Sequence, residues 1–151
     1  MQPEHCVLLV EDNADDVRLT ERALRKAGLS WPLRVAATGD AAVDYIQGTG
    51  AFTDRAANPI PTLILLDLKL PGLSGFEILQ FVRRHPLLGR TIIVMLTSSG
   101  EASDIGRAYA LGANSYLVKP IKSQELDSLM DRVKHYWLDA NLPPPVFSPA
   151  T

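Results

Sequence analysis

The chain has 151 residues, of which 46% are hydrophobic and 21% charged, and its formal net charge is −2. This composition predicts one globular domain and excludes a disordered chain, while the absence of clustered Lys or Arg argues against a nucleic-acid partner. No apolar stretch reaches the roughly 20 residues that span a bilayer, and no signal-peptide pattern opens the chain. The single cysteine, Cys6, cannot form an internal disulfide, which fits a reducing compartment. We therefore expect a cytoplasmic protein without a membrane partner.

The first half of the chain alternates apolar runs with segments of helical spacing. Short continuous apolar runs are typical of strands buried on both faces of a parallel sheet. Asp12 or Asn13 can cap the first helix, and Gly28 ends it. We expect strands over 6–10 and 33–37, helices over about 14–27 and 39–47, and a long surface loop over 48–61, which contains Gly, Pro, Asn and Asp.

The second half repeats the same alternation. The run 62–66 is the most hydrophobic, which predicts a central strand, and it stops abruptly at Asp67. Pro86 ends the helix that follows, because proline interrupts helical hydrogen bonding. We expect strands over 62–66, 92–96 and 115–118, and helices between Gly75 and Pro86, over about 103–111 and over about 123–138.

Five strands alternating with five helices predict an α/β fold. The expected architecture is a doubly wound, five-stranded parallel sheet with helices on both faces, as in flavodoxin-like proteins. We expect a single domain over residues 1–138 and a proline-containing tail or arm over 139–151, because the three consecutive prolines 143–145 cannot be helical.

The most informative polar residues all follow predicted strands. They are Glu11 and Asp12, Asp67, Thr97 and Lys119. In parallel α/β sheets the carboxyl ends of the strands form one edge, and ligands bind there at the point where the strand order reverses. The sequence therefore predicts one polar site assembled by the fold from distant residues.

Three carboxylates at one site would repel each other unless a cation lies between them. Mg²⁺ prefers such oxygen ligands and retains water molecules. A carboxylate can also act as a nucleophile and form an aspartyl phosphate, with charge spread over the phosphoryl oxygens. The ammonium of Lys119 and the hydroxyl of Thr97 are suited to contact those oxygens, so the set indicates phosphoryl transfer to Asp67.

These segments together resemble the receiver domains of response regulators. VLLVEDNADDVRLTERAL resembles their opening with its acid pair, and LILLDLKLPGLSGFEIL their phosphoacceptor strand and loop. IIVMLTSS and GANSYLVKP resemble their hydroxyl and lysine motifs. The resemblance spans about residues 5–138 and implies a two-component regulator that acts as a phosphoacceptor switch and not as an enzyme.

The resemblance implies a role for each site residue. Asp67 would be the phosphoacceptor and would bind Mg²⁺ with Asp12, while Glu11 would act on the metal chiefly through water and the backbone carbonyl of Lys69 would be a further ligand. Lys119 and Thr97 would contact the phosphoryl group. Thr97 and Tyr116 would be the switch residues, and Pro120 would follow a cis peptide bond.

The resemblance extends to the single-domain regulators that pair with bacterial phytochromes. It implies a sensor histidine kinase as phosphoryl donor, such as a bacteriophytochrome, and a histidine phosphotransfer protein as a further candidate partner. We expect a protein-contact output without a DNA-binding domain, through a homodimer that uses the fourth helix, fifth strand and last helix. Trp137 and the tail are candidates for the subunit contact.

Other interpretations of the same residues stay open at this point. An aspartate-nucleophile phosphohydrolase of the haloacid-dehalogenase type would also use Mg²⁺, but such enzymes carry an acid two residues after the nucleophile, where this chain has Lys69. A receiver fold could also serve as a phosphorylation-independent adaptor. Lys69 departs from the small polar residues common there, and its charge could pair with the acids or screen the site from water. Asp15 and Asp16 are interpreted as a solvated first helical turn.

Overall fold

Five short hydrophobic strands form the centre of the protein. The computed structural model describes residues 5–145. The strands are β1 (Val7–Val10), β2 (Leu33–Ala36), β3 (Leu63–Leu66), β4 (Ile92–Thr97) and β5 (Ser115–Val118). They pair in parallel in the order β2-β1-β3-β4-β5, so the predicted parallel sheet is confirmed and β3 is central.

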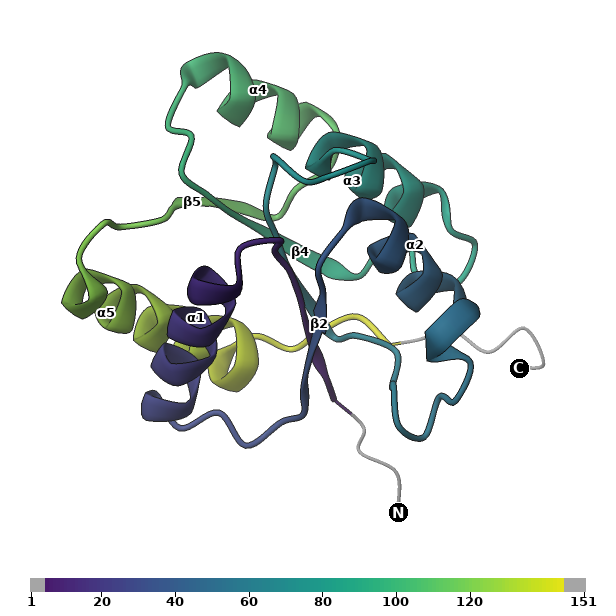
Figure 1. Ribbon diagram of the computed structural model, residues 1–151, viewed down its shortest axis with the longest axis horizontal. Helices are drawn as coiled ribbons and strands as arrows, with labels where there is room; N and C mark the ends of the chain where they lie inside the picture. Colours follow the sequence, from purple (N-terminus) through teal and green to yellow (C-terminus); the bar gives the residue numbers. More distant parts are fainter. Residues whose placement is uncertain (1–4, 146–151) are drawn as a thin grey trace.

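Helices cover both faces of this sheet (Figure 1). One face carries α1 (Ala14–Lys26) and α5 (Ser123–Val133), and the other carries α2 (Gly39–Gln47), α3 (Gly75–Arg84) and α4 (Ala102–Ala110). This arrangement confirms the doubly wound, flavodoxin-like fold. Among residues 5–145, no helix combines the length and apolar character needed to cross a membrane.

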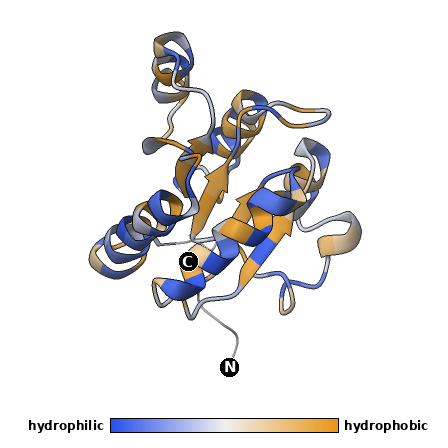
Figure 2. Ribbon diagram, turned by 60° about the vertical axis from the view of Figure 1, so that its left-hand side comes forward, coloured by the Kyte–Doolittle hydropathy of each residue, from blue (hydrophilic) through white to orange (hydrophobic). Residues whose placement is uncertain are grey.

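Each central strand supplies side chains to two hydrophobic clusters, one per face. In β1, Leu8 and Val10 point to the side of α2 and α3, whereas Val7 and Leu9 point to the side of α1 and α5. The period of two along a strand explains why continuous apolar runs are needed here. Figure 2 shows the strands as hydrophobic, while the surrounding helices carry both hydrophobic and hydrophilic residues.

The loop after α2 is held more firmly than its composition predicts. It contains a short 3₁₀ helix, Gly50–Phe52, and its Pro59 and Pro61 are buried. The guanidinium of Arg55 donates to the carbonyls of Tyr45 and Ile46, both at 2.7 Å, and so caps the carboxyl end of α2. The expectation of a simple surface loop over 48–61 is corrected in this respect.

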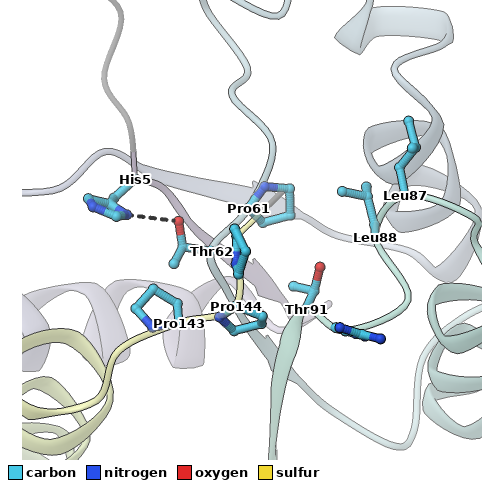
Figure 3. A pocket seen from close by; sticks show the side chains of 10 residues that line it. His5, Pro61, Thr62, Leu87, Leu88, Thr91, Pro143 and Pro144 are labelled. Carbon is cyan, nitrogen blue, oxygen red and sulfur yellow. Dashed lines mark hydrogen bonds between the residues drawn. The ribbon is translucent and has the colours of Figure 1, made fainter. Parts of the chain in front are cut away.

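After α5 the chain runs past the amino ends of the central strands. A π-helical segment, Lys134–Ala140, extends α5, and residues 141–145 are not helical. The prolines of this segment border a cavity of about 340 Å³ at the amino ends of β1, β3 and β4 (Figure 3). The lining includes His5, Thr62, Thr91, Pro143 and Pro144. The expected tail, 139–151, lies only partly within the described residues, so the division at residue 138 stays a prediction.

Candidate functional site

The strand order places the predicted polar residues at one edge of the sheet. β1 lies between β2 and β3, so chain connections leave β1 and β3 in opposite directions, and this reversal is where α/β sheets bind ligands. Glu11 and Asp12 follow β1, and Asp67 follows β3. The amide of Asp67 donates to the carbonyl of Val10 at 3.1 Å, which holds the two strand ends side by side.

Three carboxylates meet at this edge. One oxygen from each of Glu11, Asp12 and Asp67 lies within 4.8 Å of the others. Glu11 is 4% exposed and Asp67 is 7% exposed, whereas Asp12 is open to solvent. Glu11 accepts from the Asn13 amide at 3.0 Å, and Asp67 Oδ1 accepts from the Leu68 amide at 2.7 Å. Glu11 and Asp67 are therefore held in place by the backbone.

Lys119 supplies the positive charge closest to these acids. Its ammonium donates to Glu11, to Asp67 Oδ2 at 3.1 Å and to Asp16 Oδ2 at 3.2 Å. Burial alone would lower the pKa of Lys119, but the Glu11 hydrogen bond and the charge of Asp67 outweigh it and raise that pKa above its ordinary value. Burial raises the pKa of Glu11 as well, although the hydrogen bond from Lys119 opposes this effect. Four carboxylates, those of Glu11, Asp12, Asp16 and Asp67, thus lie around or beside one ammonium, so negative charge is in excess here.

A divalent cation fits this excess of negative charge. Glu11, Asp12 and Asp67 offer carboxylate oxygens close enough to share one ion, and hard cations bind such ligands. The exposure of Asp12 leaves one side of the cluster open to water. Lys69 is exposed, and its side chain forms no ion pair within residues 5–145, so the expectation that it could pair with the acids is not met.

Thr97 and Tyr116 lie on the two strands beyond β3. Thr97 ends β4 and is buried, and its hydroxyl accepts from the Ser99 amide at 3.4 Å. Tyr116, on β5, is half-buried, and its hydroxyl donates to the Ser99 carbonyl at 2.8 Å. Burial raises the pKa of Tyr116, so this hydroxyl remains a donor. In the described residues no hydrogen bond joins either side chain to Asp67.

Two residues of this region were not among the predicted site residues. Ser99 contacts both Thr97 and Tyr116, and its hydroxyl donates to Asp104 at 2.6 Å. Asp16, which was interpreted as solvated, contacts Lys119 instead. No sequence signal distinguishes Asp16 from Asp15, because Asp12 precedes the N-cap residue Asn13 and helical spacing does not relate it to α1.

The expected cis peptide bond before Pro120 is wrong for this structure. No peptide bond within residues 5–145 is cis, so Lys119 and Pro120 are joined in trans. Trans is the favoured form of such bonds by about 0.5–1 kcal/mol unless packing selects the other isomer. The Lys119 ammonium contacts Glu11, Asp16 and Asp67 with the trans bond in place.

Gly75 sets the position of α3 against the acceptor strand. A methyl group at Gly75 would lie 2.2 Å from the Asp67 carbonyl oxygen and 2.8 Å from Leu68 Cα, and neither backbone atom can move freely. Gly75→Ala is expected to lower the free energy of unfolding by about 2–4 kcal/mol, measured by urea denaturation, because α3 must shift away from β3.

Gly106 provides the matched control for that substitution. It lies in α4, and a methyl group there would contact nothing within 4 Å. Gly106→Ala is expected to be neutral or to stabilise the protein by about 0.5–1 kcal/mol. Equal effects of the two substitutions would show that the contact between Gly75 and Asp67 does not position the helix.

Known proteins share both this sequence pattern and this fold. The model of the response regulator receiver domain matches residues 7–131. Rcp1 of Synechocystis is 34% identical over 137 residues, which cover 91% of this chain and 91% of Rcp1. The structure of Mn²⁺-bound Rcp1 superimposes with a TM-score of 0.85 and covers 93% of this chain and 99% of its own, so this relative binds a divalent metal.

Two further solved structures belong to phytochrome-associated regulators. The phosphorylated cyanobacterial phytochrome response regulator RcpA is 30% identical, with a TM-score of 0.86 over 96% of this chain and 100% of its own. The bacteriophytochrome response regulator RtBRR is 41% identical, with a TM-score of 0.74 over 96% of this chain and 86% of its own. Response regulators receive a phosphoryl group from sensor kinases, and the chain belongs to this family as a two-component response regulator receiver domain, a phosphoacceptor switch.

Proposed function

We propose that Asp67 is the residue that accepts the phosphoryl group, with Mg²⁺ held by Asp12, Asp67 and the carbonyl of Lys69, and by Glu11 chiefly through water. The observation that supports this most is the buried Asp67 carboxylate, which lies within the acidic cluster and accepts from Lys119. Its Oδ1 is already bonded to the Leu68 amide, so its orientation is fixed.

In the proposed transfer one bond to phosphorus forms and another breaks. A carboxylate oxygen of Asp67 forms a bond to phosphorus while the bond from phosphorus to the donor's histidine nitrogen breaks, and the bonding pair leaves with the nitrogen. Mg²⁺, when bound, neutralises charge on the phosphoryl oxygens. Lys119 and Thr97 would contact the remaining phosphoryl oxygens and stabilise the charge that develops on them.

The proposed output is a change of the surface formed by α4, β5 and α5. Thr97 would move toward the phosphoryl group, and Tyr116, now bonded to Ser99, would turn inward and shift the population between two packings. This surface carries exposed hydrophobic side chains, Tyr109 of α4 and Val118 of β5. Exposed hydrophobic residues support a protein contact, and we propose a homodimer there.

The proposed donor is a sensor histidine kinase of the bacteriophytochrome type, because two of the similar structures are phytochrome-associated regulators. A histidine phosphotransfer protein is a further candidate partner. In the test, sensor kinases that carry a radiolabelled phosphoryl group, one of them a bacteriophytochrome, are incubated with this protein. The initial rate of phosphoryl transfer to this protein is then measured. We expect the bacteriophytochrome to transfer at least ten times faster than a kinase from another sensor class. Equal rates would contradict the proposed donor.

The dimer is tested separately by light scattering on the unphosphorylated and phosphorylated protein. We expect phosphorylation to shift the mass toward twice that of the chain, and Tyr109→Glu to prevent the shift, because a charge would be buried at the contact. A monomer at high concentration in both states would contradict the proposed dimer. Unchanged partner binding in both states would favour the adaptor interpretation.

A further inference from the structure

Asp16, a residue of α1, contacts Lys119 and so borders the candidate site. Its Oδ2 lies 3.2 Å from the Lys119 ammonium, close to the 3.1 Å between that ammonium and Asp67 Oδ2. A lysine ammonium has three N–H donors and no acceptor. Glu11, Asp16 and Asp67 therefore occupy all three donors of Lys119.

The backbone fixes Asp16 in the first turn of α1. Its amide donates to the side chain of Asn13, the N-cap residue, at 3.0 Å. Its side chain is 43% exposed, whereas the Lys119 side chain is 12% exposed. Asp16 and Lys119 also border a hollow of about 200 Å³ together with Ser98, which leaves room for the lysine to move. Asp16 can thus hold Lys119 from the solvent side without being buried itself.

We propose that Asp16 is a positioning residue that competes for Lys119 and slows the acceptance of a phosphoryl group by Asp67. To contact an incoming phosphoryl oxygen, Lys119 must release one of its three carboxylate partners. The charge of Asp16 also adds to a site that already contains the cluster of Glu11, Asp12 and Asp67, and so repels an anionic donor. This inference rests on the proposed role of Asp67.

The test measures the rate of phosphorylation by acetyl phosphate, in which Asp67 forms its bond to phosphorus while acetate leaves with the electron pair. The rate is followed by intact mass spectrometry at Mg²⁺ concentrations that saturate each variant, so that metal affinity does not affect the comparison. Asp16→Asn is expected to react about three to ten times faster than the wild type at low ionic strength, and the difference is expected to shrink in high salt.

Asp15→Asn is the matched control. Asp15 is the neighbouring residue and loses the same charge, but it pairs with Arg18 at 3.4 Å and its side chain is 79% exposed. We expect its rate to stay within about twofold of the wild type, because exposed pairs contribute little. Asp16→Glu, which keeps the charge, is expected to return toward the wild-type rate.

A second donor separates an electrostatic effect from a structural one. Phosphoramidate carries less negative charge than acetyl phosphate at neutral pH, so Asp16→Asn is expected to accelerate its reaction less. Equal acceleration of both donors would overturn the repulsion of the donor and leave competition for Lys119 as the cause. Equal rates for Asp16→Asn and Asp15→Asn, or a slower Asp16→Asn, would overturn the proposal alone. Absence of any phosphate on the wild-type protein would instead overturn the role of Asp67, and this proposal with it.

Discussion

Replacing Asp67 by asparagine is expected to abolish phosphorylation while leaving the fold intact. The amide oxygen of asparagine can still accept from the Leu68 amide, which bonds to Asp67 Oδ1 at 2.7 Å. It lacks the negative charge that makes a carboxylate oxygen a nucleophile. Intact mass spectrometry after incubation with acetyl phosphate and Mg²⁺ should show one added phosphate on the wild type and none on Asp67→Asn.

The same substitution is expected to weaken Mg²⁺ binding by at least about tenfold, because one of three clustered carboxylates is neutralised. Calorimetric titration measures this change. Asp131→Asn is the control, since Asp131 is an exposed residue of α5 that pairs with His135. Phosphate on Asp67→Asn at the wild-type level would contradict the proposed acceptor.

Replacing Lys119 by alanine is expected to slow phosphorylation by about 100-fold, because a charged donor to the phosphoryl oxygens is lost. The affinity for Mg²⁺, in contrast, should increase. The ammonium donates to Glu11 and Asp67, two members of the acidic cluster, and so competes with a cation for them. We therefore expect Lys119→Ala to bind Mg²⁺ several times more tightly, by an electrostatic argument.

Rates from mass spectrometry and affinities from calorimetry check both expectations for Lys119→Ala. Without metal this variant should also unfold at a lower temperature than the wild type, since two buried carboxylates lose their counter-charge. Saturating Mg²⁺ should restore that stability. Lys26→Ala removes the same charge from an exposed pair with Asp127, at 2.9 Å, and serves as control. Weaker metal binding by Lys119→Ala would show that the lysine does not compete with the cation.

The centre of the sheet could be predicted from the sequence because β1, β3 and β4 are continuous apolar runs that end at a polar residue. In β3 the run ends at Asp67, which lies directly after Leu66, the last strand residue. Burial on both faces requires such runs, and the parallel arrangement brings their ends to one edge. For this reason the meeting of Glu11, Asp12, Asp67 and Lys119 was also predictable.

Contacts that depend on a single side-chain direction could not be predicted. Asp15 and Asp16 are adjacent acids in one helical turn, yet Asp15 pairs with Arg18 and Asp16 reaches Lys119. Only the packing of α1 beside the end of β5 distinguishes them. The same holds for Arg55, whose two hydrogen bonds to the end of α2 hold a loop that composition alone describes as irregular.

The isomer of a peptide bond before proline is likewise a result of packing. The bond between Lys119 and Pro120 was expected to be cis on the basis of family resemblance, and it is trans here. The energy difference between the two isomers is about 0.5–1 kcal/mol, which local contacts can reverse. The residue types alone therefore do not determine it.

The most direct test of the proposed chemistry is to locate the phosphoryl group in the chain. Borohydride reduces an aspartyl phosphate to homoserine, which peptide mass spectrometry identifies by position. After treatment with acetyl phosphate and Mg²⁺, we expect homoserine at position 67 and nowhere else, and none when a chelator is present. Reduction at Glu11 or Asp12, or no reduced residue after confirmed phosphorylation, would contradict the assignment of Asp67 as the acceptor.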